Sequence, residues 1–296
     1  MPLRILDLPI LFRPGTSIVY PPFKKGRYLE EYIYEYMLQH ASSIESDCVY
    51  IPIFWTHLQN HPGFKRMKES LTLLLQKEIQ KMPKQTKYFT IVQHDDGPML
   101  PLPKDTLLFG ACTGTIPIPL IYEDTTHYLM NRPRTQDKEW LASFIGTLTH
   151  PVREHMKQCL ENKPSIYWMT KPREEWTNRI APSAADVFVE ATLQSKFCLA
   201  PRGYGRSSFR FFEAMLLDTV PVYFWDDQEW LPYKEFIDYS TIAISIQEKD
   251  IPKTYDILTS ISEETYQSMV ENIRKVRHHF TLEGVGEYIR KTIELH

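Results

Sequence analysis

The sequence has no long hydrophobic run. The apolar stretch at residues 3–8 is interrupted by Arg4 and Asp7 and ends at Pro9, so it is too short and too broken for a signal peptide or a membrane span. No Asn-X-Ser/Thr glycosylation acceptor occurs either. We therefore expect a cytoplasmic protein, with no signal peptide or membrane anchor in this chain.

Cysteine is scarce and charge is balanced. Four cysteines lie far apart and form no C-x-x-C pair, which favours buried free thiols over disulfides or a zinc site: Cys48, Cys112, Cys159 and Cys198. A formal net charge of -3 gives no electrostatic reason to expect nucleic acid or an anionic membrane as a partner. The 296 residues, 43% of them hydrophobic, are enough for two modest domains.

Apolar runs of strand length alternate with segments of helical periodicity along the whole chain. In the first half we expect strands at 4–8, 48–53 and 88–93 and helices at 28–40 and 65–81. In the second half we expect strands at 141–145, 165–169, 196–199 and 220–224 and helices at 152–160, 184–194 and 207–217. This order is typical of parallel α/β units.

We therefore predict an α/β protein with two tandem Rossmann-like domains that face a cleft. The polar, proline-bearing stretch 131–138 is the best linker, which gives an N-terminal domain at 1–135 and a C-terminal domain at 136–296. The last helix, about residues 284–295, is free to cross back onto the first domain.

The segment from Cys198 to Ala214 carries the strongest chemical signal. An apolar strand ends at Pro201, glycines follow, and Ser207 or Ser208 caps a helix. Unpaired N–H groups and the positive end of the dipole make a helix N-terminus a good phosphate site, and glycine lets the backbone approach a ligand closely. Two arginines of this loop, Arg202 and Arg206, would add positive charge beside that spot.

The helix that follows is apolar on most sides, but three polar residues share one of its faces: Arg206, Arg210 and Glu213. A polar stripe on a buried helix needs a partner. One interpretation is a structural ion pair between Arg210 and Glu213. The other places phosphates at the helix start and Glu213 on ribose hydroxyls. The residues alone leave both open.

This stretch resembles the exostosin domain of glycosyltransferase family 47. That family has the pattern S-x-F-C-L-x-P-x-G-x-G-x-x-S-x-R-x-x-E-A, followed by P-V-x-x-x-D and L-P-(F/Y). Eleven positions are in register: Ser195, Phe197, Cys198, Leu199, Pro201, Gly203, Gly205, Ser208, Arg210, Glu213 and Ala214. Weaker similarity extends upstream to the turn His94–Pro98 and to Phe144-Ile-Gly146…Arg153, and downstream through residue 280.

The resemblance implies a GT-B type fold and an inverting transfer from a UDP-sugar. The donor would bind the C-terminal domain and the acceptor the N-terminal one. Arg153 would hold the diphosphate, and Tyr167 or Met169 would lie against the uracil. The implied donor-binding residues are Gly146, Thr147, Arg153, Tyr167, Arg202, Gly203, Tyr204, Gly205, Arg206, Ser207, Ser208, Arg210 and Glu213.

The sequence departs from the family at three points. Asp218 and Thr219 replace a small residue and a cysteine, the glycine-rich run after Gly146 is shortened to residues 147–151, and the usual anchor is missing. A compact version of this kind resembles the exostosin-like enzymes of large algal viruses, which act on capsid glycans in the host cytoplasm. On that resemblance alone, UDP-xylose is the first donor hypothesis and a glycoprotein N-glycan the first acceptor.

Inversion requires a base on the acceptor side. Asp95 is the first candidate, with His94 and Asp96 beside it, because all three follow a predicted parallel strand, where α/β sheets place ligands. Asp95 also occupies the D of the family-like H-D-x-G-P turn, although Asp-Asp-Gly-Pro is equally a good turn. Trp55 and His57 are candidates for binding the acceptor, and burial at the domain interface is the alternative for the aromatic pair Phe54-Trp55.

We expect no metal and no other cofactor. His57 and His61 have a zinc-like spacing, but Pro62 ends any helix there. The pair Asp226-Asp227 is a turn rather than the D-x-D of metal-dependent transferases. Two other functions compete: a catalytically silent sugar- or UDP-binding subunit, and an NAD-dependent enzyme. Against the NAD-dependent enzyme, no G-x-G-x-x-G motif follows the first predicted strand of this sequence.

Overall fold

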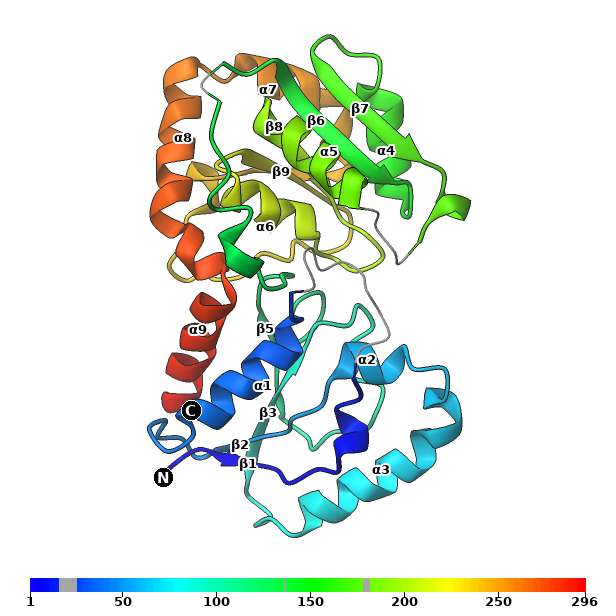
Figure 1. Cartoon of the computed structure of the whole chain (residues 1–296), viewed down its shortest axis with the longest axis vertical. Coiled ribbons are helices and arrows are strands. Elements are labelled where there is room, and N and C mark those ends of the chain that lie inside the picture. Colours follow the sequence, from blue (N-terminus) through cyan, green and yellow to red (C-terminus); the bar gives the residue numbers. More distant parts are fainter. Residues whose placement is uncertain (16–25, 136, 178–181) are drawn as a thin grey trace.

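The computed structural model describes residues 1–15, 26–135, 137–177 and 182–296. Two parallel sheets of five strands lie in two domains stacked along the long axis of the molecule (Figure 1). This confirms the GT-B type architecture that the resemblance implies. Within the described ranges, no helix combines the length and the apolar character needed to cross a membrane.

The N-terminal sheet follows sequence order, β1-β2-β3-β4-β5. Its aromatic core stacks Tyr50 on Phe89 at 4.9 Å between ring centroids, with Phe109 edge-on at 6.0 Å. The strands are β1 Arg4–Ile5, β2 Cys48–Tyr50, β3 Lys87–Val92, β4 Leu107–Gly110 and β5 Ile116–Pro117. The helices are α1 Leu29–His40, α2 Trp55–Gln59 and α3 Phe64–Gln80.

The C-terminal sheet has the order β10-β9-β8-β6-β7. Its strands are β6 Trp140–Thr147, β7 Ile166–Lys171, β8 Ser195–Pro201, β9 Val220–Trp225 and β10 Ile244–Gln247. Its helices are α4 Pro151–Leu160, α5 Pro182–Leu193, α6 Phe209–Leu216, α7 Thr254–Ser260 and α8 Glu263–Val276, followed by α9 Leu282–Glu294. The strand order reverses between β6 and β8, and open α/β sheets bind ligands at the carboxyl ends of the strands beside such a point.

The predicted strands and helices are present, with shifted ends. The strands β1 and β2 are shorter than predicted. Pro52 explains the early end of β2, because proline has no N–H to donate to a neighbouring strand. Three short strands, β4, β5 and β10, were not predicted from the sequence. The boundary predicted at residue 135 falls between the last strand of the first sheet and the first strand of the second.

Helix α9 lies against α1 of the other domain (Figure 1). Tyr32 donates a hydrogen bond to Glu283 at 3.1 Å, and Ser46 donates one to the carbonyl of Ile293 at 2.6 Å. The apolar side of α9 is buried, as its helical pattern requires. The chain therefore runs from the first domain to the second and returns to the first.

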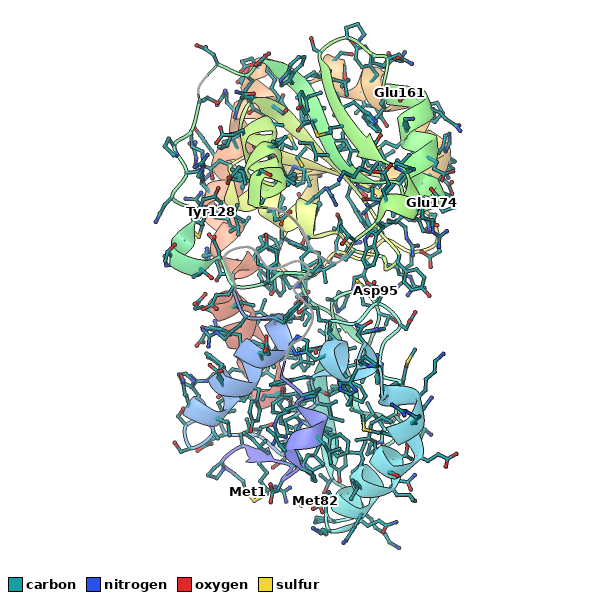
Figure 2. All side chains as sticks on the ribbon, turned by 45° about the vertical axis from the view of Figure 1, so that its right-hand side comes forward. Met1, Met82, Asp95, Tyr128, Glu161 and Glu174 are labelled. Atoms are coloured by element: carbon teal, nitrogen blue, oxygen red, sulfur yellow. The ribbon has the colours of Figure 1, made fainter. Side chains whose placement is uncertain are left out.

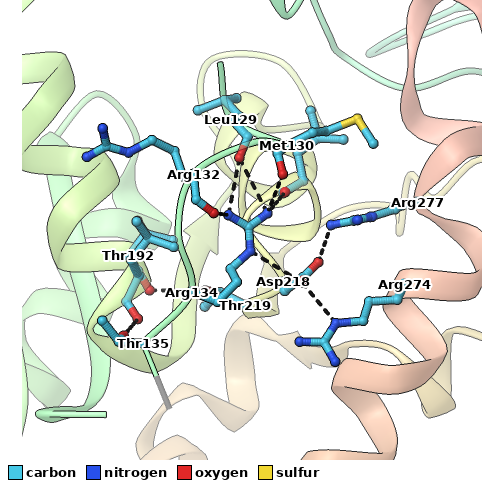
Figure 3. Close-up of polar contacts among 12 residues, drawn as sticks. Leu129, Met130, Arg132, Arg134, Thr135, Thr192, Asp218, Thr219, Arg274 and Arg277 are labelled. Atoms are coloured by element: carbon cyan, nitrogen blue, oxygen red, sulfur yellow. Dashed lines mark hydrogen bonds and ion pairs between the residues drawn. The ribbon is translucent and has the colours of Figure 1, made fainter. Parts of the chain in front are cut away.

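One buried carboxylate contacts both segments that connect the two domains, the linker and the segment that leads into α9. Asp218 forms ion pairs with Arg134 in the linker (3.3 Å), with Arg274 near the end of α8 (2.9 Å) and with Arg277, in the 3-10 helix that leads into α9 (Figure 3). Arg134 also donates to the carbonyl of Leu216 at 2.8 Å. Asp218, one of the departures from the family pattern, thus anchors both segments that join the domains.

Candidate active site

The carboxyl ends of β6 and β8 are bridged by Arg153 of α4. This buried side chain donates to the carbonyls of Thr147 at 2.8 Å, Arg202 at 2.9 Å and Pro201 at 3.4 Å. The helix begins at His150, whose ring accepts from the N–H of Val152. A fixed cation therefore lies at the reversal point of the sheet, where the resemblance places the diphosphate.

A second cation reaches the same edge from α6. Arg210 donates through Nε to the carbonyl of Ile145 at 2.7 Å, and its guanidinium lies over the ring of Phe144 at 5.6 Å. A β-carbon on Gly146 would lie only 2.6 Å from Arg210 Nη2, so any larger residue would displace this guanidinium. No ion pair links Arg210 to Glu213 in the part of the chain that the structure describes. The structural ion pair left open by the sequence is therefore absent.

Glu213 instead faces the other domain. Its Oε1 accepts a hydrogen bond from Tyr122 at 2.5 Å, and the Tyr122 ring packs on Phe209 at the start of α6. Burial raises the pKa of this carboxyl, while the Tyr122 hydrogen bond and the charge of Arg210 oppose the rise. Sequence reasoning missed Tyr122 because only tertiary contact brings it to α6.

The N-terminus of α6 has an unused hydroxyl. Ser208 occupies the N-cap position, but its side chain makes no capping bond. Its Oγ is buried and has no hydrogen-bond partner among the described residues. A buried polar atom without a partner costs about 1–3 kcal/mol, and the adjacent helix start favours a negative group. An anion bound here would accept a hydrogen bond from the Ser208 hydroxyl and would lie at the positive end of the helix.

We call residues 202–208 the glycine loop. The two arginines expected to add positive charge to it are paired with carboxylates. Arg202 contacts Asp226 and, at 2.6 Å, Asp227, while Arg206 donates to Asp227 at 2.8 Å. The pair Asp226-Asp227 therefore neutralises much of the loop's charge. We revise the arginines' role from phosphate ligands to supports that fix the loop's shape; Arg202 Nη2 also donates to the carbonyl of Tyr204 at 3.0 Å.

On the opposite side of the site, Asp95 follows β3. Figure 2 shows it where the two domains meet. A β-carbon on Gly205 would overlap Asp95 Oδ1 and lie 2.6 Å from the sulfur of Cys112, so the glycine loop packs directly on Asp95. Burial raises the pKa of Asp95, and a hydrogen bond with Cys112 opposes the rise. Burial and the charge of Asp95 raise the pKa of the Cys112 thiol.

The neighbours of Asp95 are also held in place. His94 Nδ1 accepts from the N–H of Asp96 at 3.2 Å, and burial lowers the pKa of His94. Glu30, which the sequence analysis missed, accepts from the N–H of Gln93 at 2.7 Å and fixes the end of β3. Burial raises the pKa of Glu30 to about 8.

Tyr204 lies near a carboxylate of the other domain. Its side chain is 64% exposed, and the negative charge of Asp96 is the main cause of its raised pKa. The structure thus places Tyr204 beside the acceptor-side turn.

Tyr167, predicted to lie against the uracil, lies away from this cluster. Tyr167 packs on Trp140 at 5.6 Å and pairs with Ser143, four residues before the end of β6, which puts it about 13 Å from the carboxyl edge. It cannot lie against a uracil bound at that edge. Met169, the other residue considered for the uracil, is exposed.

The two acceptor candidates are core residues. Trp55 is fully buried and donates to Thr90 at 3.0 Å, so it has no face to offer a sugar. His57 is also buried and lies edge-on to Tyr28 at 4.8 Å. Both assignments were wrong because the short helix α2 turns these side chains inward. The described residues contain no group of three side chains suited to hold a metal ion.

An open groove of about 870 Å³ lies elsewhere on the C-terminal domain, beside β10. It is lined by Tyr239, Tyr223 and other residues, and the Tyr223 hydroxyl donates a hydrogen bond to the carbonyl of Arg206 in the glycine loop. The candidate site is defined by its residues at the domain junction rather than by this groove.

Comparison with known proteins adds an independent finding. The Exostosin GT47 domain matches residues 113–261, half of the 296 residues, a range that includes β6 to β9 and the glycine loop. The chain belongs to the exostosin GT47 family. The exostosin domain thus covers Arg153, the start of α6 and Glu213, but Asp95 lies before it.

Relatives of this exostosin chain are longer proteins. A probable glycosyltransferase of Arabidopsis thaliana is 30% identical over 152 residues, 51% of this chain and 27% of that protein. A probable glucuronosyltransferase of Oryza sativa subsp. japonica is 38% identical over 74 residues, 25% of this chain and 18% of that protein. Among solved structures, the crystal structure of TarM gives a TM-score of 0.40 and 9% identity, covering 86% of this chain and 57% of that chain. The exostosin chain spans about a quarter of the Arabidopsis relative.

Proposed function

We propose that this exostosin chain is an inverting glycosyltransferase that moves a sugar from a UDP-sugar to a hydroxyl group of a glycan. The observation that carries the proposal is the contact between Asp95 of one domain and Gly205 of the other. It brings a carboxylate with a raised pKa to the loop that opens α6, where the donor phosphates would bind.

The chemistry is a single displacement. The acceptor oxygen attacks the anomeric carbon, the bond from that carbon to the UDP oxygen breaks, and Asp95 takes the hydroxyl proton. UDP leaves on the opposite face of the sugar. The negative charge that develops on the diphosphate would be stabilised by the N-terminus of α6, the Ser208 hydroxyl and the cations Arg153 and Arg210.

The donor and acceptor are narrower proposals. UDP-xylose is our first donor, with UDP-glucuronic acid second because a rice relative is named a probable glucuronosyltransferase. A glycoprotein N-glycan, modified in the cytoplasm, is our first acceptor. These choices rest on resemblance, whereas the diphosphate site rests on the geometry of α6 and β6.

A panel of UDP-sugars, scored for hydrolysis and for thermal stabilisation of the protein, tests the proposal. We expect one donor to be hydrolysed slowly and to raise the melting temperature, as ligands that bind only the folded state do. Asp95→Asn should lower turnover by roughly two to four orders of magnitude and leave UDP affinity unchanged. UDP binding without turnover of any donor would instead indicate a silent subunit, and no binding at all would overturn the assignment.

A further inference from the structure

Tyr204 is a large aromatic side chain exposed between two glycines. It is 64% exposed, while Arg202 and Gly205 in the same loop are buried. The loop around it is held by the bond from Arg202 to its carbonyl, so the ring is presented from a fixed backbone. Rigid, exposed aromatic rings with one polar end are typical of binding surfaces.

The ring lies beside a carboxylate of the opposite domain. The negative charge of Asp96 is the main cause of the raised pKa of Tyr204, and the Asp96 side chain is 39% exposed. Gly205, which follows Tyr204, is in direct contact with Asp95, which precedes Asp96. An aromatic face and an accepting carboxylate are thus both adjacent to the proposed base and open to solvent.

We propose that Tyr204 and Asp96 form the subsite that binds the acceptor sugar ring, and that this ring belongs to a neutral sugar. The Tyr204 ring would stack on the C–H face of the sugar, and Asp96 would accept a hydrogen bond from one of its hydroxyls. A uronic acid would place a second negative charge beside Asp96 and is therefore disfavoured. The inference rests on the proposed function, because it names the acceptor of that same site, and it reassigns Tyr204 from donor to acceptor.

The experiment measures binding of methyl glycosides of xylose, glucose, galactose, mannose and glucuronic acid by ligand-observed NMR, with and without saturating UDP. We expect a neutral glycoside to bind and the glucuronide to bind at least several-fold more weakly. Tyr204→Ala should raise the dissociation constant of the neutral glycoside about tenfold, a loss of about 1.4 kcal/mol, which is within the range of one aromatic contact. Tyr204→Phe keeps the ring and should stay within about threefold of wild type.

Further measurements distinguish a sugar-binding subsite from a structural contact between the domains. Phe236→Ala removes another exposed aromatic of the same domain, outside the site, and should leave glycoside binding unchanged. Hydrolysis of the UDP-sugar by water needs no acceptor, so its rate should be the same in Phe236→Ala and wild type. If Tyr204→Phe weakens binding as much as Tyr204→Ala, the residue is only a latch between the domains and the subsite is refuted.

The two proposals can fail separately. If UDP binds but no neutral glycoside does, or if Tyr204→Ala leaves glycoside binding unchanged, the acceptor subsite is wrong and the proposed function stands. If UDP and all UDP-sugars fail to bind or react, the proposed function is wrong, whatever the glycosides do.

Discussion

Gly205 packs against the carboxylate of Asp95, so a methyl group at residue 205 has no room. We predict that Gly205→Ala forces the glycine loop away from Asp95 and lowers transfer about a hundredfold, the effect expected from a displacement of about 1 Å at a reacting centre. Steady-state kinetics with the preferred UDP-sugar would measure it.

Gly203→Ala is the matched control. A β-carbon there meets only Arg153 Nη2, at 3.3 Å, a contact that is relieved by a shift of a few tenths of an ångström. We expect a loss of less than tenfold. Equal losses in the two variants would mean that any change in this loop disturbs the site, and that the contact with Asp95 has no special role.

The pH dependence of transfer should report the pKa of Asp95. A base works only when it is deprotonated, so kcat/KM falls as pH drops through its pKa. Because burial raises that pKa, the acid limb should lie above the ordinary aspartate value of about 3.9. Cys112→Ala removes a hydrogen bond that lowers the pKa and should move the limb to higher pH. An acid limb at or below pH 4, unmoved by Cys112→Ala, would place the base elsewhere.

UDP should bind without a divalent metal. The start of α6, with Arg153 and Arg210 at the edge of β6, supplies the positive groups that a metal provides in other transferases. Titration calorimetry in EDTA should therefore give the same dissociation constant, within about threefold, as in manganese. Binding that disappears in EDTA and returns with manganese would contradict this prediction.

Asp218→Asn should lower the stability of the protein without changing UDP affinity. The φ of Asp218 is 56°, a conformation that asparagine tolerates, so the substitution removes charge and leaves the backbone in place. The substitution removes the negative charge that three arginines share. We expect it to lower the free energy of unfolding, measured in urea, by about 3 kcal/mol. Arg274→Gln removes the most exposed of the three and should cost less than 1 kcal/mol.

Local sequence patterns predicted the strand, loop and helix from Cys198 to Ala214, because apolar spacing, glycines and a capping serine act over a few residues. They could not predict that Arg202 pairs with Asp226, since 24 residues and a β-strand separate them. They also failed for Trp55, because an aromatic at a strand end looks the same in sequence whether it faces a cleft or the core. Side-chain direction in a short helix depends on what packs against it.

The return of α9 to the first domain means that the two domains cannot be separated by a single cut in the linker. A fragment ending near residue 135 would leave the surface around Tyr32 of α1 and around Ser46 uncovered, and the complementary fragment would carry α9 as an exposed amphipathic helix. Heat or urea should therefore unfold the chain as one cooperative unit. The two halves should be soluble and folded only when they are expressed together.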